Sequence, residues 1–100
     1  MKAVWNDQVI AEANKSDLIR IEGNWYFPTS SINKKFFAES NHRTECMWKG
    51  TASYYDVAVD GKLNESAAWF YANPMDGSIQ KVGKDYTNFV AFWHGVEVIE

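Results

Sequence analysis

The segment ECMWKGTASYY, residues 45–55, joins the densest chemistry of the chain to its clearest fold signal. It holds the only cysteine, closely followed by a tryptophan, a lysine and a glycine. From the glycine onward, residues 50–60 alternate, so that Tyr55, Val57 and Val59 share one face. A period of two is typical of a strand with one face against a core. We therefore predict a strand over residues 50–60 and a functional site in the residues just before it.

Short alternating or wholly apolar runs, separated by turn residues, make up the rest of the chain. The pairs Asn6-Asp7 and Asp60-Gly61 are typical of tight hairpin turns, because these residue types tolerate a left-handed backbone. Further strands are predicted over residues 2–6, 8–13, 18–22, 25–27, 67–72, 87–94 and 96–99.

Helices and loops are few in this pattern. Hydroxyl side chains at residues 29–31 can cap a helix, so we predict one short helix over residues 31–37. A helical turn is predicted over residues 78–82. The polar residues 38–44 are predicted to form a loop, and residues 64–66 to complete the turn after the Asp-Gly pair.

These elements predict one compact domain over residues 1–100, mainly β, with seven to nine short strands in a barrel or a sandwich and one or two short helices. A chain of this length buries enough surface for one core. Five Trp, five Tyr and six Phe can supply that core, and some of these rings could equally line a ligand pocket.

The counts of cysteine and histidine exclude several kinds of site. One cysteine cannot form an internal disulfide, and one Cys with two His is too few for the usual structural zinc site. We therefore expect no metal and no cofactor. An unpaired thiol fits a reducing compartment, and the chain shows neither a targeting signal nor an apolar run long enough for a bilayer. A cytoplasmic monomer or weak homodimer, without a membrane partner, is expected.

The charge distribution argues against nucleic acid and leaves room for a smaller anion. A net charge of −3 is the opposite of the basic face that nucleic-acid binders present. Residues 32–50, however, hold four basic and two acidic side chains, a local balance of +2. That segment is either an ordinary solvated surface or a place for a small anionic molecule.

Five segments together resemble a known family of small bacterial proteins. They are residues 22–28, 46–55, 67–71, 73–74 and 89–96. Their order and spacing are similar to the DUF427 family, whose members have sometimes carried the label nucleotidyltransferase-like. The resemblance spans nearly the whole chain, and its most specific part is the C-x-W-K-G motif. It implies a single, mainly-β domain with a site shared across the family.

The sequence departs from the family pattern at one position. Met47 stands between the Cys and the Trp, where the family usually has Pro, so the backbone there lacks proline's fixed φ. No glycine-rich phosphate loop is present, and Asp56 and Asp60 do not form the acidic pair of metal-dependent phosphoryl transfer. The resemblance therefore implies a fold and a site more firmly than a reaction.

Cys46 is the first candidate for chemistry, because it is the only thiol. It is either a small buried apolar residue or a thiolate activated by a nearby cation such as Lys49 or a histidine. A Cys-His nucleophile pair needs an imidazole within hydrogen-bond reach. Either His94, after a predicted buried strand, or His42, in the predicted loop, is available.

Lys49 is the second candidate, directly before a glycine that lets backbone approach a ligand. It is either a solvated lysine or a group that holds a phosphate or carboxylate. Trp48 then forms a stacking wall beside it or fills the core. Glu22 is predicted to pair with Lys49 if it faces inward, in a structural or catalytic ion pair.

The remaining ligand-binding candidates are Tyr26, Asn24 and Tyr54. Asn24 lies at a bend and either shapes the backbone or contacts a ligand. Tyr54 alternates out of phase with Tyr55, so we predict an accessible, polar ring there.

Three functions fit these residues. The best supported is a small-ligand-binding β domain, with an aromatic pocket and one cation, Lys49, suited to an anionic or nucleotide-like ligand. The second is an enzyme of nucleotidyltransferase-like or thiol-dependent type, with Cys46, Lys49 or Glu22 as the reactive group. The third is a protein-interaction module that uses residues 41–48.

Overall fold

A computed structural model describes all of residues 1–100 and is mainly β, as predicted. Nine strands form three antiparallel sheets with strand orders β5-β6-β7-β8, β2-β1-β9 and β3-β4. The sheets stay open and do not close into a barrel. None of the helices has the length and apolar character that crossing a bilayer requires.

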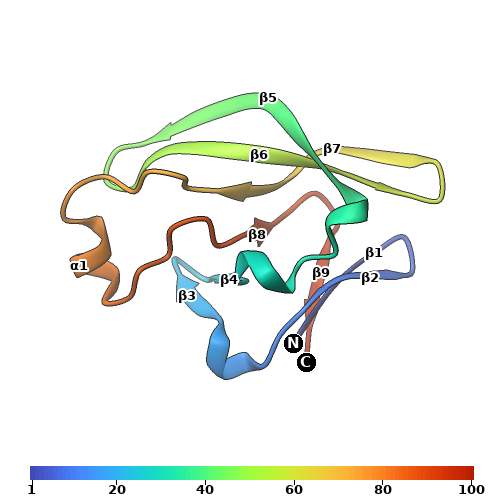
Figure 1. The fold of residues 1–100 in the computed structure, drawn as a ribbon, viewed down its shortest axis with the longest axis horizontal. Coiled ribbons are helices and arrows are strands. Elements are labelled where there is room, and N and C mark those ends of the chain that lie inside the picture. The colour runs from blue at the N-terminus through green and yellow to red at the C-terminus, as the bar shows by residue number, and fades with distance from the viewer.

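The largest sheet is built from two long hairpins in succession (Figure 1). Its strands are β5 (Phe37–Cys46), β6 (Gly50–Val59), β7 (Lys62–Phe70) and β8 (Ala91–Phe92). The hairpin between β6 and β7 turns at Asp60 and Gly61, whose φ values of 50° and 77° are both left-handed, as the Asp-Gly signal predicts. The pairing of β7 with both β6 and β8 places it inside the sheet.

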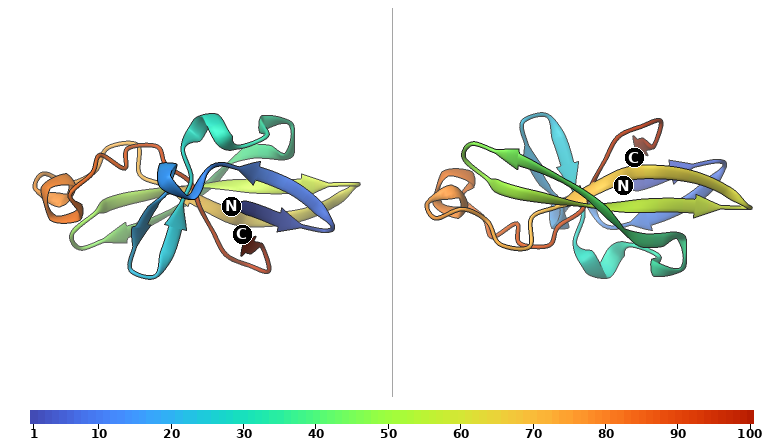
Figure 2. Two further views of the ribbon diagram at one scale, coloured as in Figure 1. Left: turned by 90° about the horizontal axis from the view of Figure 1, so that it is seen from below. Right: turned by 90° about the horizontal axis from the view of Figure 1, so that it is seen from above.

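Two smaller sheets lie on one side of this large one (Figure 1), and the views from below and above in Figure 2 show them crossing over it. Strands β1 (Lys2–Trp5), β2 (Gln8–Glu12) and β9 (Glu97–Ile99) bring both ends of the chain together. The hairpin β3 (Ile19–Ile21) and β4 (Asn24–Tyr26) forms the other small sheet.

The core divides into two clusters that follow the two small sheets. One joins β1 and β2 to the distal half of β6 through apolar residues such as Ile10, Val57 and Val59. The other joins the β3–β4 hairpin to the proximal half of β6 and holds four tyrosines; they are Tyr26, Tyr54, Tyr71 and Tyr86. The second cluster packs against Cys46 and Trp48, two of the candidate site residues.

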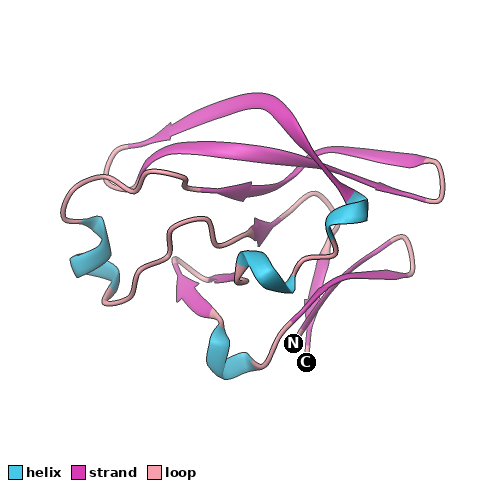
Figure 3. Cartoon of the chain, in the orientation of Figure 1, coloured by secondary structure: helices cyan, strands magenta, loops and turns pink.

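The predicted helix over residues 31–37 is wrong. Thr29–Ser31 and Lys34–Phe36 form two separate 3₁₀ turns, and Phe37 already begins β5 (Figure 3). The predicted loop over residues 38–44 is also wrong, because these residues belong to β5. β5 is an edge strand with a bulge between Glu39 and Arg43, so most of its side chains are exposed and no apolar alternation marks it.

Two more boundaries differ from expectation. Residues 64–66 are part of β7, which starts at Lys62, and not part of a turn. The apolar run 87–94 contributes only the two-residue β8, since Val90 makes a single bridge with Phe27 and the rest is irregular. The helical turn predicted over Ser78–Val82 is confirmed as α1.

Candidate functional site

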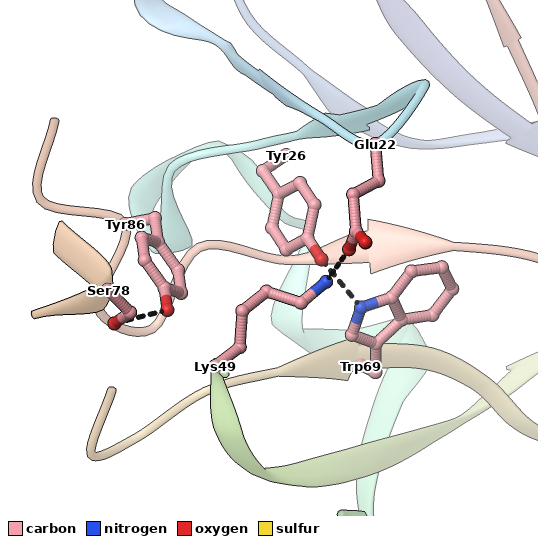
Figure 4. A network of polar contacts seen from close by, with 6 residues as sticks. All are labelled: Glu22, Tyr26, Lys49, Trp69, Ser78 and Tyr86. Carbon is pink, nitrogen blue, oxygen red and sulfur yellow. Dashed lines mark hydrogen bonds and ion pairs between the residues drawn. The ribbon is translucent and has the colours of Figure 1, made fainter. Parts of the chain in front are cut away.

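Lys49 is the only buried charged residue of the protein, with 5% of its surface exposed. It ends the turn between β5 and β6, and its amine donates a hydrogen bond to the Glu22 carboxylate, forming an ion pair (Figure 4). The two ends of this pair differ in exposure, because the Glu22 side chain is 53% exposed. The pair therefore joins a buried cation to an anion that water can reach.

Both partners are positioned by tight turns. Gly50 has φ of 104°, and a Cβ there would lie 3.4 Å from backbone atoms of Asn73 and Met75. The Lys49 carbonyl accepts a 2.9 Å hydrogen bond from the Met75 amide, which fixes the start of β6 against the segment before α1. Glu22 has φ of 52° at the tip of the β3–β4 hairpin, an uncommon conformation for a residue with a side chain.

Aromatic rings surround the amine. The Lys49 Nζ atom lies 5.3 Å from the ring centres of both Trp48 and Tyr71, within the range of cation–π attraction. The Tyr26 hydroxyl points to the same place and accepts a 3.0 Å hydrogen bond from the Trp69 indole (Figure 4). Three rings and one carboxylate thus lie around a single ammonium group.

The electrostatics of this cluster keep the amine charged. Burial would lower the pKa of Lys49, but the hydrogen bond with Glu22 and the proximity of Tyr26 and Tyr71 outweigh it, so the pKa is raised. The pKa of Glu22 is lowered, chiefly by the hydrogen bond from Lys49. An amine held protonated in this way has no lone pair, which disfavours Lys49 as a nucleophile while the pair is intact.

The tyrosines beside the amine stay neutral. Burial raises the pKa of Tyr71 to about 12, although the nearby Lys49 charge acts in the opposite direction. Burial also raises the pKa of Tyr26. Both hydroxyls are therefore hydrogen-bonding groups at neutral pH and are not phenolate bases.

The structure brings Glu22, Trp48, Lys49 and Tyr26 together, as the sequence suggested for a shared site. Asn24 is half-buried at the start of β4, opposite Ile21, and no hydrogen bond joins it to Lys49.

Tyr54 differs from expectation, because it is buried and not accessible. Its hydroxyl shares a 2.9 Å hydrogen bond with Thr44. The reason is an irregularity in the pairing of β6 with β7 between Tyr55 and Val57, which reverses the alternation. Tyr54 therefore faces the core before the bulge, as Val57 does after it.

Several members of the cluster carry no signal that a single sequence makes legible. Lys81 on α1 places its amine 4.7 Å from the Trp48 ring centre, so the amines of both Lys81 and Lys49 lie near the Trp48 ring. Tyr86 is fully buried and donates a 2.8 Å hydrogen bond to Ser78. These residues follow the Asn73-Pro74 break and come near Lys49 only in the folded chain. An alignment of the family is the signal that could have found them.

The amine does not line an open cavity. The protein has three surface hollows, and neither Lys49 nor Trp48 nor Tyr26 lines any of them. The space beside the amine is filled by the Glu22 side chain and the rings. No group of three His, Cys, Asp or Glu side chains lies close enough together to hold a metal ion.

Cys46 lies at the end of β5, half-buried at the margin of the tyrosine-rich core. No hydrogen bond joins it to either histidine; His42 and His94 instead line a separate hollow. The Cys-His pair considered from the sequence is therefore not assembled in this structure.

We expect Cys46 to react with iodoacetamide more slowly in the folded protein than in urea, because the thiol is partly covered and no imidazole contacts it. Mass spectrometry of samples quenched over a range of pH measures both rates. A folded-state rate above that of the unfolded chain would contradict this expectation and favour thiol catalysis.

We call Lys49 with Glu22, Trp48, Tyr26 and Tyr71 the lysine centre. The fold and this lysine centre define a small, mainly-β domain with one enclosed cation. Residues 1–99 match the family described as a domain of unknown function, DUF427. The chain belongs to that family. No curated protein matches the sequence.

Proposed function

We propose that the domain binds a small anionic ligand at Lys49, and that a carboxylate or phosphate of the ligand takes the place of the Glu22 carboxylate. The observation that carries this proposal is that the only buried charge of the protein is a cation whose counter-ion is a half-exposed side chain. A buried ammonium group needs an anion beside it. The Glu22 carboxylate can rotate into water, where its own charge is solvated, once a ligand anion replaces it.

The surroundings of the amine favour a ligand with a planar ring. Trp48 and Tyr71 present their rings at equal distances from the Lys49 amine. Aromatic walls with one fixed charge are typical of sites for small organic molecules. A nucleotide or an aromatic acid combines an anionic group with such a ring. A cytoplasmic location, which the free thiol favours, would give access to both kinds of compound.

Binding without covalent chemistry is preferred to an enzymatic reaction at this site. The raised pKa of Lys49 keeps its amine protonated, and no hydrogen bond joins the thiol of Cys46 to His42 or His94, which line a separate hollow. These two candidates of the enzyme hypothesis therefore lack the activation that a nucleophile requires.

The test is a thermal-shift titration with phosphate, pyrophosphate, adenosine monophosphate and benzoate at constant ionic strength. A ligand that binds only the folded state raises its stability, by about 2.7 kcal/mol at a hundred times its Kd. We expect Glu22→Gln to increase the shift in melting temperature, because the competing carboxylate is gone. Lys49→Met should abolish the shift.

Lys62→Met is the matched control, because Lys62 is an exposed lysine at the start of β7, away from the site. It removes the same charge and should leave the shift unchanged. Equal shifts in wild type, Lys49→Met and Lys62→Met would overturn the proposal, as would the absence of any shift in both wild type and Glu22→Gln.

A further inference from the structure

A second group of functional side chains meets at a surface hollow of about 580 Å³ that Lys49 does not line. The hollow lies where β5 bulges between Glu39 and Arg43 and where the pairing of β6 with β7 is irregular. Bulges next to one another re-aim several side chains into one space. Among the residues that line the hollow are His42, Asp56, Glu65, Ser66, Trp93 and His94.

The aromatic side chains of the hollow pack on one another and on the buried ring of Tyr54 behind them. His42 packs on Tyr54 with ring centres 4.6 Å apart, Tyr54 stacks on Trp93 at 6.0 Å, and Trp93 contacts His94 at 4.1 Å. Trp93 is 41% exposed, although large aromatic side chains are usually well covered in a folded domain. An indole exposed to this extent leaves part of its π surface open to a ligand, although Tyr54, Trp69 and His94 pack on the rest of the ring.

The formal charges that line the hollow are negative. Asp56 and Glu65 are its only charged side chains besides the two imidazoles. Asp56 Oδ1 accepts a 2.8 Å hydrogen bond from the Ser66 amide, which leaves its other oxygen free. Arg43 is not among the residues that line the hollow, and its guanidinium donates hydrogen bonds to the Ser40 and His42 carbonyl oxygens at 2.8 and 2.7 Å.

The backbone holds these groups in a fixed and uncommon geometry. Ser66 and His94 both have φ of 53°, in the left-handed region that residues with side chains rarely adopt. The Trp93 indole donates a hydrogen bond to the Ser66 carbonyl, and the side-chain amide of Asn64 donates one to the His94 carbonyl at 2.9 Å. Left-handed residues of this kind, stabilised by their surroundings, often mark ligand sites.

We infer that this hollow is a site for a small organic ammonium cation, a quaternary ammonium or a protonated amine. An exposed indole beside two carboxylates attracts such a cation through its π face and its charge together. An inorganic metal ion is a poorer occupant, because no three ligand side chains converge here. An anion would face two carboxylates. This site is independent of the one at Lys49 and takes ligands of opposite charge.

The experiment uses choline and its neutral isostere, 3,3-dimethylbutan-1-ol, at pH 8. Titration into ¹⁵N-labelled protein, followed by heteronuclear NMR, reports on the indole N–H of Trp93 and the amide of His94 directly. We expect choline to shift these resonances and the neutral alcohol to bind at least several-fold more weakly. Trp93→Leu should weaken choline binding about 2- to 30-fold.

Glu65→Gln removes an exposed carboxylate of the hollow and should weaken choline binding about 2- to 5-fold without disturbing the fold. The matched control is Glu39→Gln, an exposed acid on β5 that does not line the hollow and should leave the affinity unchanged. Since Glu65→Gln spares all the hydrogen bonds above, the test survives even if Trp93→Leu fails to fold. Equal affinity for choline and its isostere would overturn the inference, as would no shift at these two resonances, or equal losses in Glu65→Gln and Glu39→Gln.

Discussion

Replacing Tyr26 with alanine should lower the free energy of unfolding by about 3–5 kcal/mol, the range for deleting a large buried ring. Tyr26 is fully buried and packs edge-on against Trp69 and Tyr86, with ring centres 6.2 and 6.4 Å away. The ring connects β4 to Trp69 on β7 and to Tyr86 in the loop after α1, so its loss leaves a cavity where these three segments meet. Urea denaturation followed by tryptophan fluorescence measures the change.

Tyr26→Phe separates the ring from its hydroxyl. It keeps the packing but removes the acceptor of the Trp69 indole, so we expect a cost of only about 1 kcal/mol. A loss below 1 kcal/mol for Tyr26→Ala would show that the β3–β4 hairpin contributes little to the core. A Phe variant as unstable as the Ala variant would instead place most of the energy in the hydrogen bond.

The hairpins were predictable because their turns are encoded by residue type. Asn6 and Asp7 have φ values of 49° and 61°, and Asp60 and Gly61 are left-handed in the same way. Residue types that tolerate this conformation are concentrated at such turns. The two hairpins can therefore be predicted from their turn residues alone, without knowledge of the core. The mainly-β class followed from these turns and the alternating runs between them.

The wrong predictions, those for Tyr54 and for the loop over residues 38–44, have a different physical origin. Irregular strand pairing hides the two-residue alternation from which a strand is recognised. The bulge after Tyr55 reverses which side chains of β6 face the core, and Tyr54 is consequently buried. The edge strand β5 buries few of its side chains, so its residues resemble a loop in sequence. Nothing local in the sequence shows where a strand slips its register.

The candidate site was predictable in part. Lys49 and Trp48 were predicted because they lie just before a glycine, and Glu22 because it is an acid at a bend. The fold brings the three residues together. The burial of the amine depended on Tyr71 and on the segment that follows it, which reach Lys49 only through the tertiary structure. Sequence thus indicated the charged groups but not the enclosure that decides their chemistry.

Replacing Glu22 with glutamine should lower the free energy of unfolding by about 1–3 kcal/mol, because it leaves the Lys49 ammonium buried without an anion. Breaking a fully buried pair costs about 3–5 kcal/mol, and the half-exposed position of Glu22 reduces that figure, since water can reach the amine from the same side. The variant should still fold, because domains of this kind have about 5–15 kcal/mol of stability. Urea denaturation again measures the change.

The double variant Glu22→Gln/Lys49→Met should be more stable than Glu22→Gln alone, because no uncompensated charge remains. A double-mutant cycle then gives the coupling between the two side chains. If the losses of the two single variants add up to the loss of the double variant, the coupling is zero and the ion pair does not contribute to stability. Lys62→Met in place of Lys49→Met serves as the control, and no recovery is expected from it.

The same pair should give the wild-type protein a pH dependence that both single variants lose. The pKa of Glu22 is lowered below its usual 4.5, so its contribution to stability is present above that pH and is lost as the pH falls through the folded-state value. The pKa of Lys49 is raised above 10.5, so its contribution is present below that pH and is lost as the pH rises further. Stability differences between wild type and Glu22→Gln should therefore be greatest on the plateau between these limits and shrink on the acid side. A difference that stays constant down to pH 2 would mean that the carboxylate acts through packing and not through its charge, and Glu22 would then be a poor stand-in for a ligand anion.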